Sequence, residues 1–216
     1  MTELSKRVYT SIFLITIFLL SLYNNYLLSA ILIFCIYQIF YEFYNLLKNL
    51  FSKKELIKLY ILLITILMIL ILTTGFIWLN INSSKNFDKI YIFFLISISI
   101  TTDIGGYIFG KIFKGKKLTN ISPKKTYSGM FGSFITSSFI VYFAFKDYFE
   151  NDFLFLIILF ISAISQFGDI FISYLKRKNK KKDTGSILPG HGGLLDRFDG
   201  IIFTLSSGIL LKSIVL

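Results

Sequence analysis

The sequence is poor in charged side chains and nearly devoid of cysteine, proline and histidine. Only 16% of the 216 residues are charged and 55% are hydrophobic, whereas about 25% of an average soluble domain is charged. This shortage of polar groups excludes a soluble globular domain, and the apolar excess excludes a disordered chain. The single cysteine, Cys35, excludes an internal disulfide and a cysteine-based zinc site.

The chain is rich in long uncharged runs. They cover residues 8–23, 26–41, 59–79, 90–102, 128–145, 153–168 and 201–211. A membrane-spanning helix needs about 20 mostly apolar residues, and some runs reach that length only with polar neighbours, as 103–110 and 169–175 extend the fourth and sixth. We predict an all-α polytopic membrane protein with about seven transmembrane helices. Only Asn24 and Asn25 separate the first two runs, so one bent hairpin remains an alternative there. The first run is predicted to be a retained anchor, because no small-residue cleavage site follows it.

The positive charge is unevenly distributed. A net charge of +11 is typical of binding to nucleic acid or to an anionic membrane surface. The basic residues lie in short loops between the apolar runs, which favours the membrane and argues against nucleic acid. With a cytoplasmic N-terminus and seven crossings, 19 of the 23 basic residues face the cytoplasm, as the positive-inside rule requires. The active site is therefore predicted to face the cytoplasm.

Rare residue types gather in two windows, 103–132 and 168–200. These windows hold both prolines, the only histidine, two of the three arginines and 12 of the 14 glycines. Glycine and proline at such density indicate tight turns, close helix approach or contact with phosphate.

The first window begins inside the fourth predicted span. The charged side chain of Asp103 is energetically costly inside a membrane span and by default marks a functional site. A structural pair with a neighbouring lysine is the alternative. Asp103, Gly106 and Gly110 lie near one helical face, which permits close helix packing. The following loop supplies two ammonium groups and two hydroxyls that suit a phosphate, unless its lysines are only positive-inside charge. These loop residues are Ser122, Lys124, Lys125 and Thr126.

The second window combines carboxylates, cations and a glycine turn. Asp196 and Asp199 share a face if the last helix starts near Leu194, and acids at a helix N-terminus are favourable. The turn 189–193 can present backbone N–H groups to an anion. Together these groups suit a metal-bound polyphosphate. The alternative, a solvated basic face with His191 as a turn residue, does not explain the clustering.

The second window resembles the C-terminal signature of phosphatidate cytidylyltransferases (CDP-diacylglycerol synthases). The matching positions are Ser173, Lys176, Arg177, Lys182, Asp183, Gly185, Pro189, His191, Gly192, Gly193, Asp196, Arg197 and Asp199. The first window is similar to the family's Asp-x-Gly-x-Tyr stretch and Ser-Pro-Lys-Lys-Thr loop. The family usually continues that loop with Trp-Glu-Gly, and this chain has Tyr127-Ser128-Gly129, so a carboxylate is missing at Ser128.

The resemblance implies the reaction of CTP with phosphatidic acid to give CDP-diacylglycerol and pyrophosphate. It implies Mg²⁺, with Asp169 and Asp196 as leading ligands and Asp199 next; a second cation is left open. The implied catalytic residues are Asp169, Asp196, Asp199, Arg197, Lys176 and Arg177. The implied substrate-binding residues are Ser122, Lys124, Lys125, Thr126, Lys182, Asp183, His191, Gly192, Gly193 and Asp103.

These expectations extend to the whole chain. Residues 1–216 are predicted to form a single integral membrane domain, with 1–100 as N-terminal anchor helices and 101–216 as the catalytic half. The predicted partners are CTP, phosphatidic acid and the lipid bilayer, with a homodimer as a candidate assembly and a bacterial inner membrane as the location. Two alternatives remain. One is a related CTP-dependent enzyme acting on another lipid phosphate or a polyprenol. The other is a small ion transporter that uses Asp103 and Asp169 as ligands.

Overall fold

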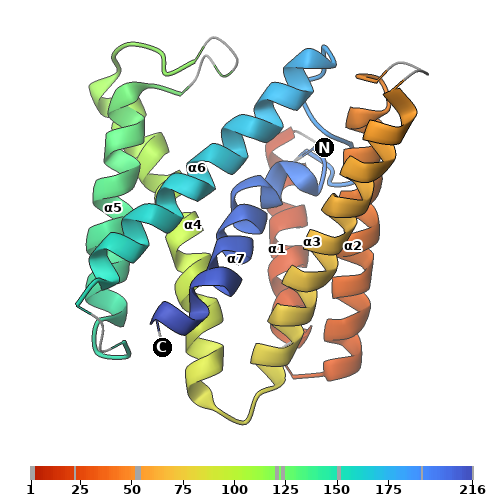
Figure 1. Ribbon diagram of the computed structural model, residues 1–216. Coiled ribbons are helices and arrows are strands. Elements are labelled where there is room, and N and C mark those ends of the chain that lie inside the picture. Colours follow the sequence, from red (N-terminus) through yellow and green to blue (C-terminus); the bar gives the residue numbers. More distant parts are fainter. Residues whose placement is uncertain are drawn as a thin grey trace. The chain divides into compact units, whose positions relative to one another are not determined.

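The described part of the chain is mostly helical. The computed structural model describes residues 3–21, 23–51, 55–119, 122, 125–149, 152–190 and 192–215 (Figure 1). Within them lie seven α-helices and no β-strand, which confirms the all-α prediction. The helices are α1 (Glu3–Ser21), α2 (Asn25–Leu47), α3 (Leu56–Asn82), α4 (Asn86–Phe113), α5 (Tyr127–Phe145), α6 (Leu154–Lys178) and α7 (Leu195–Val215).

Five of these helices, α2 to α6, are long and apolar enough to cross a membrane. The chain therefore has the character of an integral membrane protein. Its apolar stretch in α1, Val8–Ser21, is shorter, and a count of seven spans stays a prediction.

Local sequence explains where the helices begin. The Asn24 side chain accepts hydrogen bonds from the backbone N–H groups of Tyr26 (2.9 Å) and Leu27 (3.2 Å). This N-cap separates α1 from α2, because it supplies the partners that the first helical N–H groups lack. Thr126 caps α5 in the same way, accepting from the N–H of Gly129 at 3.1 Å. The polar stretches 103–110 and 169–175 lie inside α4 and α6, as predicted.

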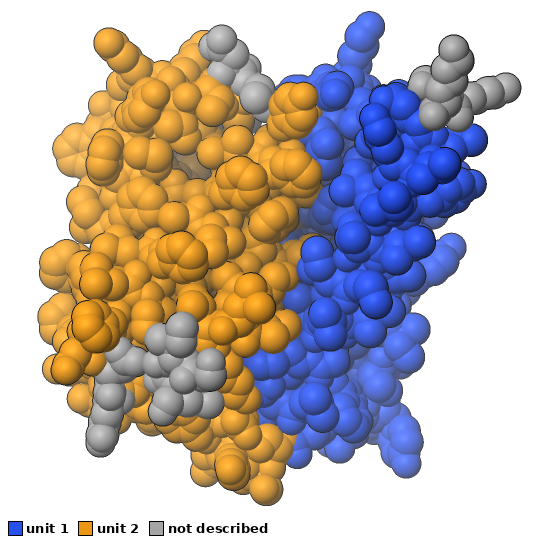
Figure 2. All heavy atoms as spheres, in the orientation of Figure 1, with its two compact units in different colours: residues 1–82, 175–198 blue, residues 83–174, 199–216 orange. Residues whose placement is uncertain are grey.

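The chain forms two compact units, coloured separately in Figure 2. Unit 1 holds Met1–Asn82 and Leu175–Phe198, and unit 2 holds Ser83–Tyr174 and Asp199–Leu216. In unit 1, α2 packs against both α1 and α3. In unit 2, α4 and α5 lie side by side (Figure 1). The division at residue 100 remains a prediction about function.

Glycines let α4 and α5 approach closely. A Cβ atom on Gly129 would lie 2.7 Å from the carbonyl oxygen of Gly106, and one on Gly110 would lie 3.6 Å from the Cα of Gly129. Any larger residue at Gly129 would therefore push on backbone, which cannot yield cheaply. This confirms the close packing predicted for the Gly106 and Gly110 face.

Buried hydroxyls pair with one another inside unit 2. Thr102 and Ser162 lie 2.8 Å apart, and Ser162 also accepts a hydrogen bond from Ser137 at 3.1 Å. Ser99 and Ser165 form a further pair at 3.2 Å. Such pairs join the polar sides of helices where water is absent, and they hold α6 against α4 near the residues described next.

Candidate active site

A cavity of about 220 Å³ lies in unit 2 among α4, α5, α6 and the loop before α5. It brings together Asp103 and Asp169 with Lys125, three charged residues that are far apart in the sequence. Its remaining polar lining is Ser122, Thr126, Ser133, Thr102 and Gln166. The structure thus gathers the one acid of the first window, the basic loop and Asp169 of α6 around one space.

Lys125 and Asp169 form an ion pair in this cavity. Their side chains are 26% and 28% exposed, so the pair is accessible from the cavity. Gln166, one helical turn before Asp169, has a buried side-chain nitrogen without a hydrogen-bond partner. An unpaired buried donor is costly, and here it lines a space where a ligand oxygen could accept its hydrogen bond.

The loop before α5 is held by its own backbone. The N–H of Leu118 donates to the carbonyl of Lys125 (2.8 Å), and the N–H of Lys125 donates to that of Ser122 (3.0 Å). Lys124 lies outside the described residues. Ser128, where the family usually has a carboxylate, donates its hydroxyl proton to the carbonyl of Lys114. Its hydroxyl therefore closes the loop, and Thr126 serves as the cap of α5.

Unit 1 contains the second group of predicted site residues, centred on Asp196. Lys176 Nζ lies 2.7 Å from Asp196 Oδ1. Asp196 Oδ2 accepts hydrogen bonds from the backbone N–H groups of Thr184 (2.8 Å) and Gly193 (2.9 Å). Burial opposes the charge on Asp196, but the hydrogen bonds from Lys176, Thr184 and Gly193 outweigh it and lower the pKa of this carboxyl. Asp196 is thus held ionised at the start of α7.

The remaining charged residues of the signature are more open. Arg177, Lys182, Asp183 and Arg197 are exposed, and Arg177 Nη1 donates to the carbonyl of Lys181 at 2.9 Å. Helix α7 begins at Leu195, so the predicted spacing of Asp196 and Asp199 along one helix is met.

The glycine turn is closed by its own hydrogen bonds. Leu188 and Gly192 exchange two backbone hydrogen bonds of 3.0 and 3.1 Å. Gly190 and Gly192 have φ values of +77° and +83°, a region that favours glycine. The N–H groups of Gly192 and Gly193 bond within the loop, to Leu188 and Asp196. These two N–H groups shape the loop, and the one on Gly193 donates to the carboxylate of Asp196. Binding of a substrate anion by the turn stays a prediction, and His191 lies outside the described residues.

Two polar residues, one beside the candidate site residues of each unit, were given no role from the sequence. Gln166 lies in the sixth apolar run and Glu42 directly follows Tyr41, the end of the second. Glu42 is only 2% exposed and contacts the segment that carries Asp196. The sequence feature that could have identified them is their position: each is a polar side chain at or inside a run that is otherwise apolar.

A second, larger cavity of about 700 Å³ lies in unit 1 between α1, α2 and the segment 187–198. Its lining is almost wholly apolar and includes Phe13, Phe34 and Cys35. Arg197 also lines it. A large apolar space with a guanidinium on its wall suits a molecule that has a hydrocarbon part and an anionic part.

The carboxylates present fit a Mg²⁺ ion. No group of three histidine, cysteine or acidic residues with metal-binding geometry exists among the described residues. Mg²⁺, however, usually binds through one or two carboxylates and completes its shell with water and substrate phosphates. Asp103 and Asp169 line one cavity. Among the described residues, Lys176 is the one hydrogen-bond partner of Asp196 Oδ1.

Comparison with known proteins identifies the family of the chain. Residues 1–214 match the profile of the cytidylyltransferase family. The phosphatidate cytidylyltransferase of Rickettsia conorii is 40% identical over 161 residues, which cover 70% of this chain and 69% of that protein. The Rickettsia felis enzyme of the same name is 46% identical over 125 residues, 53% of this chain and 54% of the relative. The one from Staphylococcus epidermidis is 44% identical over 119 residues, 53% of this chain and 46% of the relative. The matched segments thus span about half to two thirds of these relatives, and the chain belongs to the cytidylyltransferase family.

Proposed function

We propose that this chain is a membrane nucleotidyltransferase that makes CDP-diacylglycerol and pyrophosphate from CTP and phosphatidic acid in phospholipid synthesis. The observation that carries the proposal is the set of signature residues in 173–199, in a chain whose relatives are named phosphatidate cytidylyltransferases. The two cavities agree with a reaction between a polyanion and a lipid.

The chemistry explains the kinds of residue present. A phosphate oxygen of phosphatidic acid attacks the α-phosphorus of CTP, the bond to the β-phosphate breaks, and pyrophosphate leaves. That phosphate is already anionic near neutral pH, so a strong base is not needed. The obstacle is to bring two polyanions together, and positioning and charge neutralisation overcome it.

Each charged group has a role in this scheme. Lys125, Lys176, Arg177 and Arg197 hold phosphate oxygens, and arginine can do so through two parallel hydrogen bonds. Asp169 and Asp196 would hold Mg²⁺. Asp103 belongs to the first window, and Asp199 follows Asp196 in the second. When bound, Mg²⁺ supplies positive charge at the triphosphate.

The apolar cavity of unit 1 supports a lipid substrate. Arg197 lines a space of about 700 Å³ whose other walls are mainly aliphatic and aromatic. An acyl chain would fill such a space while the lipid phosphate meets the guanidinium. We place the reaction at the cytoplasmic face of a bacterial inner membrane, on the basis of the basic-residue asymmetry.

Product formation by the purified protein tests the proposal. The protein in mixed micelles should convert CTP and phosphatidic acid to CDP-diacylglycerol and release pyrophosphate in equal amount, and only with Mg²⁺ present. Micelles with a polyprenyl phosphate replacing phosphatidic acid are the matched comparison. CTP consumption with the polyprenyl phosphate but none with phosphatidic acid would assign the enzyme to the alternative substrate class.

A further inference from the structure

Helix α7 starts without an N-cap of its own. The residues before and at its start are Gly193, Leu194 and Leu195, and none has a side chain that can accept a hydrogen bond. The first N–H groups of a helix have no partner within the helix and need an acceptor from elsewhere. The start of α7 therefore depends on an acceptor from another segment of the chain.

Glu42 of α2 supplies that acceptor. Its Oε1 accepts from the N–H of Leu194 and its Oε2 from the N–H of Leu195, each at 3.0 Å. Gln38 Nε2 donates to Oε1 at 2.7 Å, and the Thr184 hydroxyl donates to Oε2 at 2.5 Å. Four donors thus fill the four acceptor positions of one carboxylate, and the negative charge lies at the positive end of the helix.

Two signature glycines make room for this carboxylate. A Cβ atom on Gly185 would lie 2.9 Å from Glu42 Oε1, and one on Gly193 would overlap both Glu42 Oε2 and the Thr184 hydroxyl. The need for glycine at these two positions is therefore explained by a residue of α2 that lies outside the signature.

The same contacts lead to Asp196. The Thr184 N–H donates to Asp196 Oδ2 at 2.8 Å, and the Thr184 hydroxyl lies 2.5 Å from Glu42 Oε2 and 3.1 Å from Asp196 Oδ2. Gly193, whose N–H also binds Asp196, directly precedes the leucines that Glu42 caps. Because every link is one short hydrogen bond, a shift of Glu42 moves the donors that orient the Asp196 carboxylate.

We propose that Glu42 is a positioning residue for the reaction: its buried carboxylate caps α7 and holds Thr184, and it thereby sets the orientation of Asp196. This inference rests on the proposed function for its kinetic consequence. Its structural consequence is independent of any activity.

The test is Glu42→Gln, with Glu55→Gln as the matched control. Glutamine keeps the size of Glu42 but directs an amide NH₂ at two of the four donors. Glu55 is a partly exposed acid of the same unit that pairs with Lys58, and it undergoes the same chemical change. In E42Q we expect faster hydrogen exchange in peptides covering 184–196 and unchanged exchange in α3. Exchange in E55Q should match the original protein.

Kinetics separate positioning from a loss of folding. E42Q should lower kcat at least about tenfold while KM for CTP changes less than about threefold. Thr184→Val, which removes the hydroxyl at similar size, should lower kcat as well, and the double variant should lose less than the product of the two single losses. A uniform loss of folded enzyme would lower all rates equally and would not produce this coupling.

The outcomes are distinct. Unchanged exchange over 184–196 in E42Q overturns the proposal, and so does a kcat within about twofold of the original protein. If the original protein shows no CTP- and phosphatidate-dependent turnover, the proposed function fails, and the exchange measurement alone then decides whether Glu42 holds this segment.

Discussion

Each unit pairs a predicted metal-ligand aspartate with a lysine. Lys125 contacts Asp169 in unit 2, and Lys176 contacts Asp196 in unit 1. A lysine is a flexible point charge that can transfer from a carboxylate to a phosphate oxygen when a substrate arrives. At the scale of single residues, these pairs neutralise the carboxylates. The side chains of Lys125 and Asp169 are about a quarter exposed, whereas those of Lys176 and Asp196 are only 11% and 7% exposed.

Removing either carboxylate charge should abolish turnover. We expect Asp196→Asn and Asp169→Asn each to eliminate Mg²⁺-dependent product formation, because each loses a ligand charge at nearly constant shape. Asp147→Asn, an exposed aspartate outside both cavities, is the control and should retain full activity. Near-normal activity of either site variant would show that its carboxylate does not bind the essential metal.

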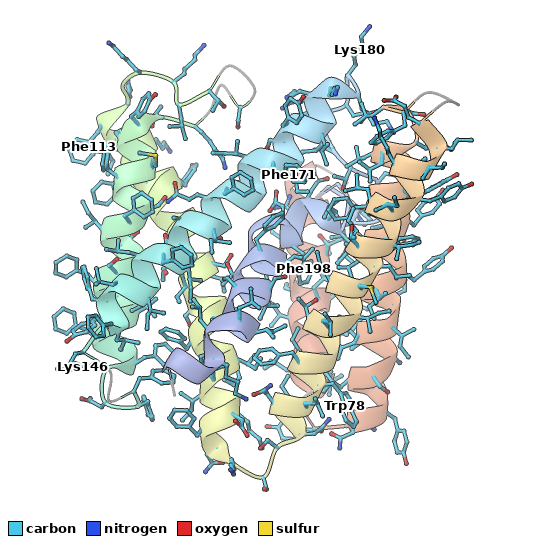
Figure 3. All side chains as sticks on the ribbon, viewed as in Figure 1. Trp78, Phe113, Lys146, Phe171, Lys180 and Phe198 are labelled. Carbon is cyan, nitrogen blue, oxygen red and sulfur yellow. The ribbon has the colours of Figure 1, made fainter. Side chains whose placement is uncertain are left out.

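Arg197 should matter for chemistry as well as for binding. Arg197→Lys keeps the charge but loses bidentate contact with phosphate, so kcat should fall at least about tenfold, or about 1.4 kcal/mol. Lys180 is exposed and its side chain extends away from the end of α6 (Figure 3). Lys180→Ala should therefore change kcat little. Steady-state kinetics in mixed micelles measure both, and equal small losses would mean that Arg197 provides only general positive charge.

The environment of Asp196 predicts how stability depends on pH. Asp196 lies in the first turn of α7, and its pKa in the folded protein is lowered. Its contribution to stability is therefore complete above the unfolded-state pKa of about 3.9 and is lost as the pH falls through the lower folded-state value. Thermal unfolding in detergent from pH 6 to pH 3 should show a steeper loss below about pH 4 for the original protein than for Asp196→Asn. Parallel curves for the two would contradict this.

At the scale of elements, apolar runs predicted the helices well because burial in lipid requires uninterrupted backbone hydrogen bonding. The sequence also predicted that Asp103 and Asp169 lie within helices, and that the last helix starts beside Asp196. It could not predict the cap of α7, because the acceptor is Glu42, 152 residues before Leu194. Helical periodicity carries no information about contacts of that range.

The contact between α4 and α5 makes a prediction of its own. Gly129→Ala should destabilise the protein by about 1–3 kcal/mol, because the new methyl group would meet the backbone of Gly106. Gly75→Ala is the matched control, since a Cβ there has nothing within 4 Å. Thermal unfolding in detergent compares the two. Equal midpoints would show that α4 and α5 can separate without cost.

At the scale of the whole molecule, the two compact units are interleaved along the chain. Unit 1 takes its last segment from Leu175–Phe198, after all of Ser83–Tyr174 has entered unit 2. Composition predicted the membrane class, and the signature supplied the candidate site residues. The grouping of those residues into units could not be predicted, because it depends on long-range packing and not on local pattern.

The basic loops predict the orientation of the chain in the membrane. With Cys35 replaced by alanine, a cysteine placed at Lys117 or Lys181 should react only with reagents added from the cytoplasmic side, and one at Lys85 only from the outside. Vesicles of defined orientation give the measurement. Labelling of position 117 or 181 from the outer side alone would reverse the predicted topology.

The long separation between Glu42 and its partners has a consequence during synthesis. At about 5–20 residues per second, the ribosome needs about 8 to 30 s to make the 152 residues between Glu42 and Leu194. During that interval α2 enters the bilayer with the acidic side chain of Glu42. Of the four hydrogen-bond donors to this side chain, only Gln38, one helical turn away, has already been synthesised. A nascent α2 must therefore keep this end near water or the insertion machinery, and the arrival of 184–195 completes its burial.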